Sequence, residues 1–188
     1  MILCSEERMK TANTQSHSRK QAEKSQNRQR VFDALKDLDI PFQIYDHPPI
    51  RTSGDAFLLS EDIGGVKCKN LFLRNNEGTN HYLVILEMES RCDLKTLARK
   101  LNEKRLGFAS EDWLMRYLGV HPGSVSPFNP LNGNGKEVCL VVEEALLIHE
   151  KLAFHPNENT ATLVLSVRDF IKYLRSLENR VDFIDLSF

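Results

Sequence analysis

Two kinds of apolar spacing run along this chain, one typical of amphipathic helices and one typical of strands. The clearest helical stretch is "DLKTLARKLNEK", where Leu94, Leu97 and Leu101 recur three or four residues apart and Asp93 can cap the first turn. The stretch "SEDWLMRYLG" ends at Gly119, a typical C-terminal stop. The spacing predicts helices over residues 25–38, 53–62, 93–104, 110–119 and 167–178.

Shorter runs rich in apolar residues lie between these helices. They predict strands over residues 42–47, 66–74, 80–88, 137–143, 151–154 and 161–165. "NNEG" is a hairpin signal, and the Pro, Gly and Asn of residues 120–136 predict a long loop. Strands and helices do not alternate strictly, so we expect an α/β (α+β) fold with a mixed, mostly antiparallel sheet and helices packed around it.

Length and composition indicate one globular domain. The chain has 188 residues, 41% of them apolar and 27% charged. Residues 1–24 are polar and predict a disordered N-terminal tail, which leaves 25–188 as the domain. Residues 1–30 hold seven Lys or Arg and three Glu, and the remainder holds eighteen against twenty-three acidic residues. A slightly acidic body argues against wrapping DNA, while a local contact with a nucleic-acid end stays open.

The sequence also bears on location and cofactors. It has no apolar run long enough for a membrane span, and "MILCSEERMK" lacks the apolar stretch of a signal peptide. We therefore expect a cytoplasmic protein with no membrane partner. The four cysteines are scattered, which indicates free thiols. "HEKLAFH" holds His149, Glu150 and His155 but is not HExxH, so we expect neither a metal nor a cofactor.

Two polar residues stand at the start of the most apolar strand. In "GGVKCKNLFLRN", Lys69 and Asn70 directly precede Leu71, Phe72 and Leu73. An unpaired amide-like group costs ~2–7 kcal/mol to bury. Lys69 is either a lysine that reaches solvent or pairs with a carboxylate, or it meets a phosphate or carboxylate of a ligand in a pocket. No GxSxG motif is present, and Cys68, which would point away from Lys69, reads as a buried inert cysteine.

Two further patterns allow both a structural and a functional interpretation. His47, His121 and His155 each precede proline, which fixes an extended backbone that suits a plain turn as well as a site. Six basic side chains fall in residues 91–105, against two acidic ones. This cluster is either a solvated helix face or a contact for a short phosphate backbone.

Three motifs resemble one family. "KNLFLRN", "LGFASEDWLMRYLGVHPGSVSPFNPLN" and "AFHPNENTATLVLSVRDFIKYL" occur in the order found in the prolyl-tRNA synthetase-associated (YbaK-like) editing domain family, over about residues 28–178. The resemblance implies a mixed sheet partly rolled around a pocket. It is strongest to the branch of free-standing Ala-tRNA(Pro) deacylases.

The resemblance also implies site residues. Lys69 would bind the phosphate-ribose end of the tRNA, with Asn70 beside it. The other implied roles are backbone groups at the ester for Gly123 and Ser124, closure of the amino-acid pocket for His155 with Asn159 nearby, and acceptor-stem contacts for Arg74, Lys104 and Arg105. Asn157 departs from the family, which more often has an apolar residue there.

The function implied is hydrolysis of mischarged Ala-tRNA(Pro), which protects proline codons. A site built for proline cannot reject the smaller alanine strongly, because one methylene is worth only ~1–3 kcal/mol. The family's proposed mechanism is metal-free and assisted by the ribose 2′-hydroxyl. The expected partner is the tRNA(Pro) acceptor end, with prolyl-tRNA synthetase or an elongation factor as further candidates. The alternatives are hydrolysis of Cys-tRNA(Pro) or another small misacylated residue, and a non-catalytic tRNA- or synthetase-binding module.

Overall fold

The computed structural model describes residues 26–49, 63–132 and 134–186. Its α-helices are residues 26–37, α3 (Leu94–Lys100), α4 (Glu111–Leu118) and α5 (Val167–Ser176). Three 3-10 helices follow in the second half of the chain: η1 (Asn129–Asn132), η2 (Asn134–Glu137) and η3 (Glu144–Ile148). The strands are β1 (Gln43–Asp46), β2 (Val66–Asn75), β3 (His81–Glu87), β4 (Leu106–Phe108), β5 (Val138–Glu143), β6 (Lys151–Phe154), β7 (Ala161–Ser166) and β8 (Val181–Ile184).

One sheet holds all eight of these strands, in the order β1-β7-β6-β2-β3-β5-β8 with β4 against β2. Four pairings are antiparallel and three are parallel. The predicted hairpin joins β2 to β3, where Gly78 takes the left-handed backbone angle φ +71° that the tight turn needs. The expected mixed α+β fold is confirmed.

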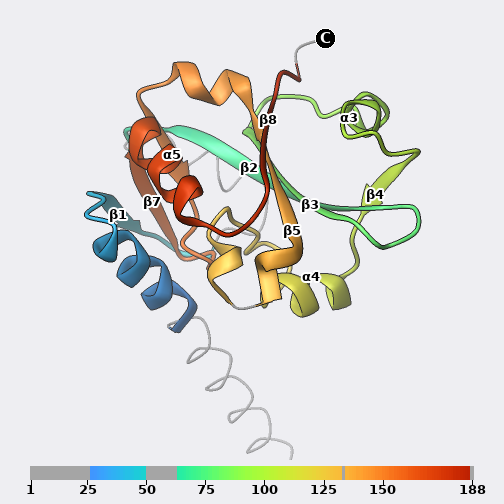
Figure 1. Ribbon diagram of the computed structural model, residues 1–188. Helices are drawn as coiled ribbons and strands as arrows, with labels where there is room; N and C mark the ends of the chain where they lie inside the picture. The colour runs from blue at the N-terminus through green and yellow to red at the C-terminus, as the bar shows by residue number, and fades with distance from the viewer. Residues whose placement is uncertain (1–25, 50–62, 133, 187–188) are drawn as a thin grey trace, which may run out of the picture.

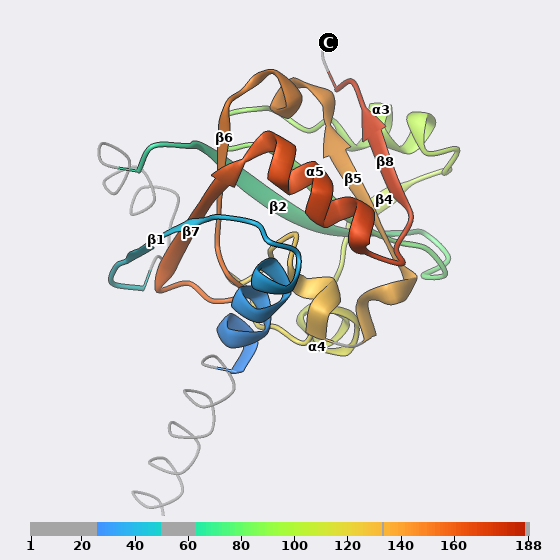
Figure 2. The ribbon, with the colours of Figure 1, turned by 60° about the vertical axis from the view of Figure 1, so that its left-hand side comes forward.

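Each face of the sheet has its own core. On the inner face, apolar side chains of both halves of the sheet pack against helix 26–37, α4 and α5, with Leu35, Phe170 and Tyr173 fully buried. On the outer face, Leu73, Val84 and Leu97 form a smaller core beneath α3. Figures 1 and 2 show α5 and α3 on opposite sides of the β2–β3–β5 ribbon. β2 is therefore covered on both faces over its second half.

Several elements differ from the expectation. β4 and β8 were not predicted, because three or four residues with an internal glycine or aspartate carry little strand signal. The predicted helix 93–104 ends at Lys100, and Asn102 follows in the left-handed region. The predicted helix 53–62 and the tail of residues 1–24 lie outside the described residues. Within the described ranges, no helix is long and apolar enough to cross a membrane.

Candidate functional site

β2 and β6 diverge shortly after they meet. They pair in parallel only at Val66–Leu152 and Lys67–Ala153. The same edge of β2 pairs again, with β4, only from Leu73 onward. Between these two pairings, residues 68–71 face no strand on this edge among the described residues. We use the name fork for this gap in pairing together with the segments around it, which are residues 67–70 of β2, residues 153–155 and the loop 123–126.

The loop 123–126 closes the fork from the inner face. Asn70 Nδ2 donates to Val125 O over 3.1 Å, while Asn70 Oδ1 is buried with no hydrogen-bond partner. A buried acceptor without a donor costs about 1–3 kcal/mol, so this oxygen is a candidate to accept from a ligand. Gly123 has φ +85°, and no heavy atom lies within 4 Å of where its Cβ would be.

The loop also offers unbonded amides. Ser124 N–H donates to His121 O, and Ser124 O accepts from Asn129 Nδ2. In contrast, the N–H groups of Gly123 and Val125 form no hydrogen bond in the described part of the chain. The main-chain donors that remain for a ligand therefore belong to Gly123 and Val125 rather than to Ser124.

Lys69 and His155 reach the outer face on either side of the fork. Phe154 packs in the inner core, and side chains alternate along a strand, so Ala153 and His155 point outward. Lys67 lies beside Ala153, which places Lys67 and Lys69 on that same face. Lys69 Nζ donates to Ser90 O, so this ammonium already has one protein partner but keeps two N–H groups.

His155 is held as a neutral imidazole. Burial lowers its pKa, and the nearby His47 and Lys67 lower it further. Its Nδ1 lies 3.1 Å from Ala161 O, and because a carbonyl only accepts, Nδ1 carries the proton. Nε2 is therefore left as an acceptor.

A buried polar network fixes the loop that carries His155. Ser126 Oγ donates to His155 O, and Asn129 Nδ2 donates to Asn157 Oδ1 over 2.8 Å. Asn157 is 1% exposed and adopts φ +58°, which asparagine tolerates better than most residues. The departure from the family pattern at this position thus joins two loops behind the site. Arg28 of the first helix adds an ion pair to Glu158.

Two side chains near the fork were not among the predicted site residues. His47 stacks edge-on to His155, with 6.2 Å between ring centroids, and its Nε2 is hydrogen-bonded to Thr162 Oγ1 over 3.0 Å. Burial lowers the pKa of Lys67. The sequence carried a weak signal for each: His47 precedes a proline, and Lys67 alternates with Lys69 along the strand.

The predicted tRNA contacts lie beyond the fork rather than in it. Arg74 lies on the inner face and donates to the carbonyls of Asn75 and Asn76. Lys104 and Arg105 are exposed between α3 and β4. Asn159 is half-buried in the loop after His155.

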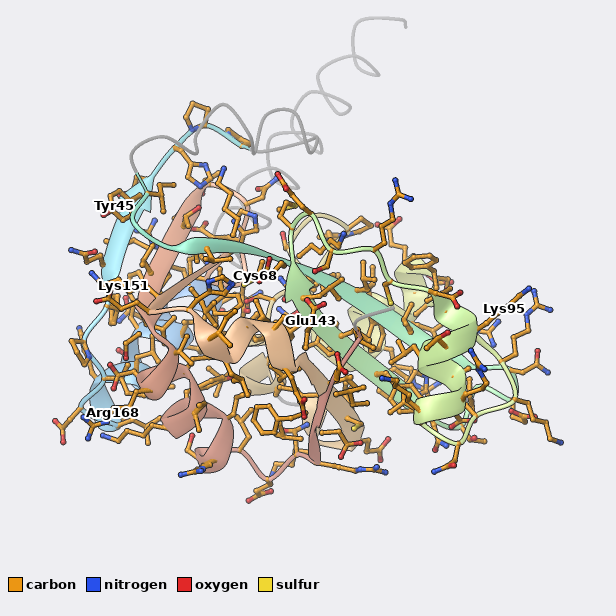
Figure 3. All side chains as sticks on the ribbon, turned by 90° about the horizontal axis from the view of Figure 1, so that it is seen from above. Tyr45, Cys68, Lys95, Glu143, Lys151 and Arg168 are labelled. Atoms are coloured by element: carbon orange, nitrogen blue, oxygen red, sulfur yellow. The ribbon has the colours of Figure 1, made fainter. Side chains whose placement is uncertain are left out.

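Two cysteines near the fork are poorly suited to act as nucleophiles. Burial raises the pKa of Cys68 and of Cys92, which disfavours either thiolate. Figure 3 places Cys68 in the middle of the molecule, close to Glu143. Among the described residues, no group of three or more His, Cys, Asp or Glu side chains could hold a metal ion.

Comparison with known proteins gives concordant matches. The model of the aminoacyl-tRNA editing domain matches residues 47–173. The prolyl-tRNA editing protein ProX of Acetoanaerobium sticklandii is 38% identical over 85% of this chain and 97% of its own length. The mouse prolyl-tRNA synthetase associated domain-containing protein 1 is 30% identical over 81% of this chain and 92% of its own. A solved structure described as a proposed trans-editing enzyme for prolyl tRNA synthetase shares the fold, with a TM-score of 0.67, 19% identity, and coverage of 86% and 97%.

Proposed function

Since the chain belongs to the aminoacyl-tRNA editing domain family, we propose that it hydrolyses mischarged Ala-tRNA(Pro) and that the fork holds the scissile ester. The observation that carries this proposal is the buried, unpaired Oδ1 of Asn70, whose Nδ2 bonds Val125 O in the loop that also carries the unbonded amides of Gly123 and Val125. Donors and an acceptor without partners are thus gathered at one gap in the sheet. A substrate with a carbonyl and a hydroxyl would satisfy both kinds of group.

The tRNA end would be held from both sides of the fork. Lys69 keeps N–H groups for the terminal phosphate, a contact that a lysine makes as a point charge. Asn70 Oδ1 would accept from the ribose 2′-hydroxyl. The neutral Nε2 of His155 would accept from the α-ammonium of the amino acid. This orientation places the ester carbonyl toward the loop 123–126.

Hydrolysis then needs a positioned water and a stabilised oxyanion. Water attacks the carbonyl carbon, and the N–H groups of Gly123 and Val125 donate to the oxygen as it becomes negative. The bond from the carbonyl carbon to the ribose oxygen breaks, and that oxygen takes the proton that the attacking water gives up. The products are free alanine and tRNA with its terminal hydroxyl restored. Burial raises the pKa of Cys68 and of Cys92, which disfavours a thiolate nucleophile and supports water as the attacking group.

Alanine is the proposed residue because a second site can sort by size where the synthetase cannot. Binding discriminates weakly against a missing methylene. The wall formed by His155 and His47, joined by the Ser126 and Asn157 network, would exclude the proline ring by shape. The relative from Acetoanaerobium sticklandii carries a name for prolyl-tRNA editing, which supports tRNA(Pro) as the carrier.

A deacylation time course tests this function. The purified chain is mixed with Ala-, Cys- or Pro-tRNA(Pro), and acid-precipitable label is followed. We expect fast loss from Ala-tRNA(Pro) and a rate at the level of the uncatalysed reaction for Pro-tRNA(Pro). Faster hydrolysis of Cys-tRNA(Pro) than of Ala-tRNA(Pro) would reassign the substrate. No hydrolysis of any of the three would indicate a non-catalytic binding module.

A further inference from the structure

An exposed aromatic ring lies on the same strand edge as the fork. Phe108 ends β4 and is 64% exposed, whereas most large apolar side chains of the described residues are buried. Its backbone is fixed, because Phe108 lies opposite Leu73 in the β2–β4 register and the next amide, of Ala109, donates to Phe72 O over 3.0 Å. The exposure of this ring therefore belongs to the folded sheet and does not result from a frayed end.

Register relates Phe108 to Lys69. Residues directly opposite each other in an antiparallel pair point to the same face, so Phe108 shares the outer face with Leu73, Leu71 and Lys69. Leu73 and Lys69 are four residues apart, about 13 Å along a strand. Between them lies the edge of β2 that pairs with no described strand. Phe108 therefore marks one end of this open edge and Lys69 marks the other.

Two cationic side chains lie just before the strand that carries Phe108. Lys104 and Arg105 directly precede β4, are exposed, and form no hydrogen bond or ion pair in the described part of the chain. Phe108 itself stacks on no other ring among the described residues. A single exposed phenyl ring is ordinary on a protein surface. A fixed ring between two sets of cations, beside an open strand edge, has the features of a single-strand RNA platform.

We propose that Phe108 stacks on an unpaired base of the tRNA 3′ end, one of the two cytosines that precede the terminal adenosine. The inference rests on the proposed function, which places the terminal phosphate at Lys69. The single strand then passes the open edge of β2 between Lys69 and Phe108, and the acceptor stem reaches Lys104 and Arg105. Phe108 is thus a tRNA-binding residue that holds the single strand between the ester and the stem.

Binding and hydrolysis are measured together to test this. Wild type, Phe108→Ala and Phe108→Trp are titrated with a 5′-labelled acceptor-stem hairpin that ends in CCA and with the same hairpin lacking CCA. Each protein is also assayed on Ala-tRNA(Pro) and on 3′-O-alanyl-adenosine, which has no cytosine. Ile148→Ala is the matched control, because Ile148 is 83% exposed but lies in η3.

We expect Phe108→Ala to weaken binding of the CCA hairpin and kcat/KM on Ala-tRNA(Pro) by about tenfold, as for loss of one stacked base. Phe108→Trp should retain both, and hydrolysis of alanyl-adenosine should not change. Removing CCA should weaken wild type by more than tenfold, because the contacts at Lys69 and Asn70 are lost as well, and should weaken Phe108→Ala about tenfold less than wild type. Ile148→Ala should behave as wild type.

The contrary outcomes are distinct. Unchanged binding and turnover in Phe108→Ala would overturn the inference and leave the proposed function standing. If Phe108→Ala binds the hairpin more weakly than wild type, but wild type hydrolyses none of the substrates, the proposed function is rejected and the stacking role of Phe108 stands. If the wild type binds neither hairpin, both fail. A concentration-dependent dimer in sedimentation that Phe108→Ala abolishes would show that the ring instead covers a second copy of this chain.

Discussion

The two halves of β2 differ although they belong to one strand. Its first half, residues 66–70, carries two lysines and an asparagine, and all of its side chains except Cys68 are partly exposed. Its second half packs Phe72 and Leu73 into the two cores and is paired with β3 on one edge and β4 on the other. Lys69 and Asn70 thus lie where pairing on one edge stops, and the fully buried Leu73 lies where both edges are paired. In this sheet, a gap in pairing marks the candidate site.

The largest expected effect falls on the stability of the second half. Leu73 is fully buried in the outer core. Leu73→Ala should lower the free energy of unfolding by about 2–5 kcal/mol, because it removes buried methyl groups and leaves a cavity. Urea denaturation measures this loss. The half-buried Leu71 gives the control, since Leu71→Ala should cost clearly less. Equal losses for both variants would mean that Leu73, where pairing is complete, is no more tightly packed than Leu71 beside the gap.

The next largest effect falls on activity in the first half. Lys69→Ala should lower kcat/KM on Ala-tRNA(Pro) by about 10²–10³-fold, the usual loss when a charged or oxyanion contact is removed. Its melting temperature should stay close to that of wild type, because Lys69 bonds only one carbonyl. Lys95→Ala is the control, as Lys95 lies on α3 well away from the neighbouring Cys68 (Figure 3). A sharply lower melting temperature with normal turnover would make Lys69 a structural cation.

Selectivity should change at the other side of the fork. His155→Ala enlarges the proposed pocket and loosens alanine, and a misplacement of about 1 Å can cost roughly 100-fold in rate. We expect kcat/KM to fall on Ala-tRNA(Pro) and to rise on substrates with larger residues. The Ala-to-Cys ratio of kcat/KM, measured on one protein preparation, reports the change. A uniform fall with an unchanged ratio would assign His155 to the turn before Pro156 alone.

Low pH should have a smaller effect, on the free energy of unfolding, through a histidine that lies opposite the second half of β2. Burial lowers the pKa of His81, which lies opposite Arg74 in the second half, and Arg116 and Arg74 add to this. The unfolded chain binds a proton near pH 6.5, and the folded chain does so only at lower pH. Stability is therefore complete above about pH 6.5 and falls as pH drops from there toward the folded pKa, with a slope of up to ~1.4 kcal/mol per pH unit. Burial also lowers the pKa of His155, so His155 should make the protein less stable at low pH in the same way.

His81→Phe removes one of these two groups. Between pH 7.5 and pH 5.5, this variant should lose less stability than wild type in urea denaturation, while its Ala-tRNA(Pro) turnover keeps the wild-type pH profile. Phenylalanine can keep the stack with Phe72 and Tyr117. Identical acid sensitivity of the two proteins would show that His81 does not titrate on unfolding as described.

The smallest expected effect is that of a chelator. The proposed reaction uses amides and water, and the described residues offer no metal cluster. Incubation with EDTA followed by desalting should leave the deacylation rate within error of the untreated enzyme. Activity that is lost in EDTA and restored by zinc would replace the amide-based mechanism with a metal-based one.

Much of this architecture could be predicted from the sequence. The helical spacing of apolar residues and the capping residues located α4, and the NNEG turn located the β2–β3 hairpin. β4 could not be predicted, because three residues around Gly107 have no periodicity and are held by pairing with β2. The fork depends on where β2 and β6 separate, a contact between residues about 85 positions apart. Local spacing therefore indicated Lys69 and Asn70, and strand alternation assigned them to opposite faces, but it did not indicate the gap beside them.

The role of Asn157 also could not be predicted from the sequence. The sequence showed only that Asn157 departs from the family, whereas its role depends on hydrogen bonds to Asn129 and Phe128, almost thirty residues away. His47 likewise gained significance only from its place beside His155.

The location of the substrate is the central claim, and binding of a stable analogue tests it most directly. 3′-Alanylamido-adenosine 5′-phosphate replaces the ester oxygen by nitrogen and is not hydrolysed. It is titrated into ¹⁵N-labelled protein, and amide shifts are mapped. The account predicts the largest changes at Lys69, Asn70, Gly123, Val125 and His155, with small changes at α5. Saturable changes confined to a surface away from the fork, such as the groove along Arg168 and Lys172, would contradict it.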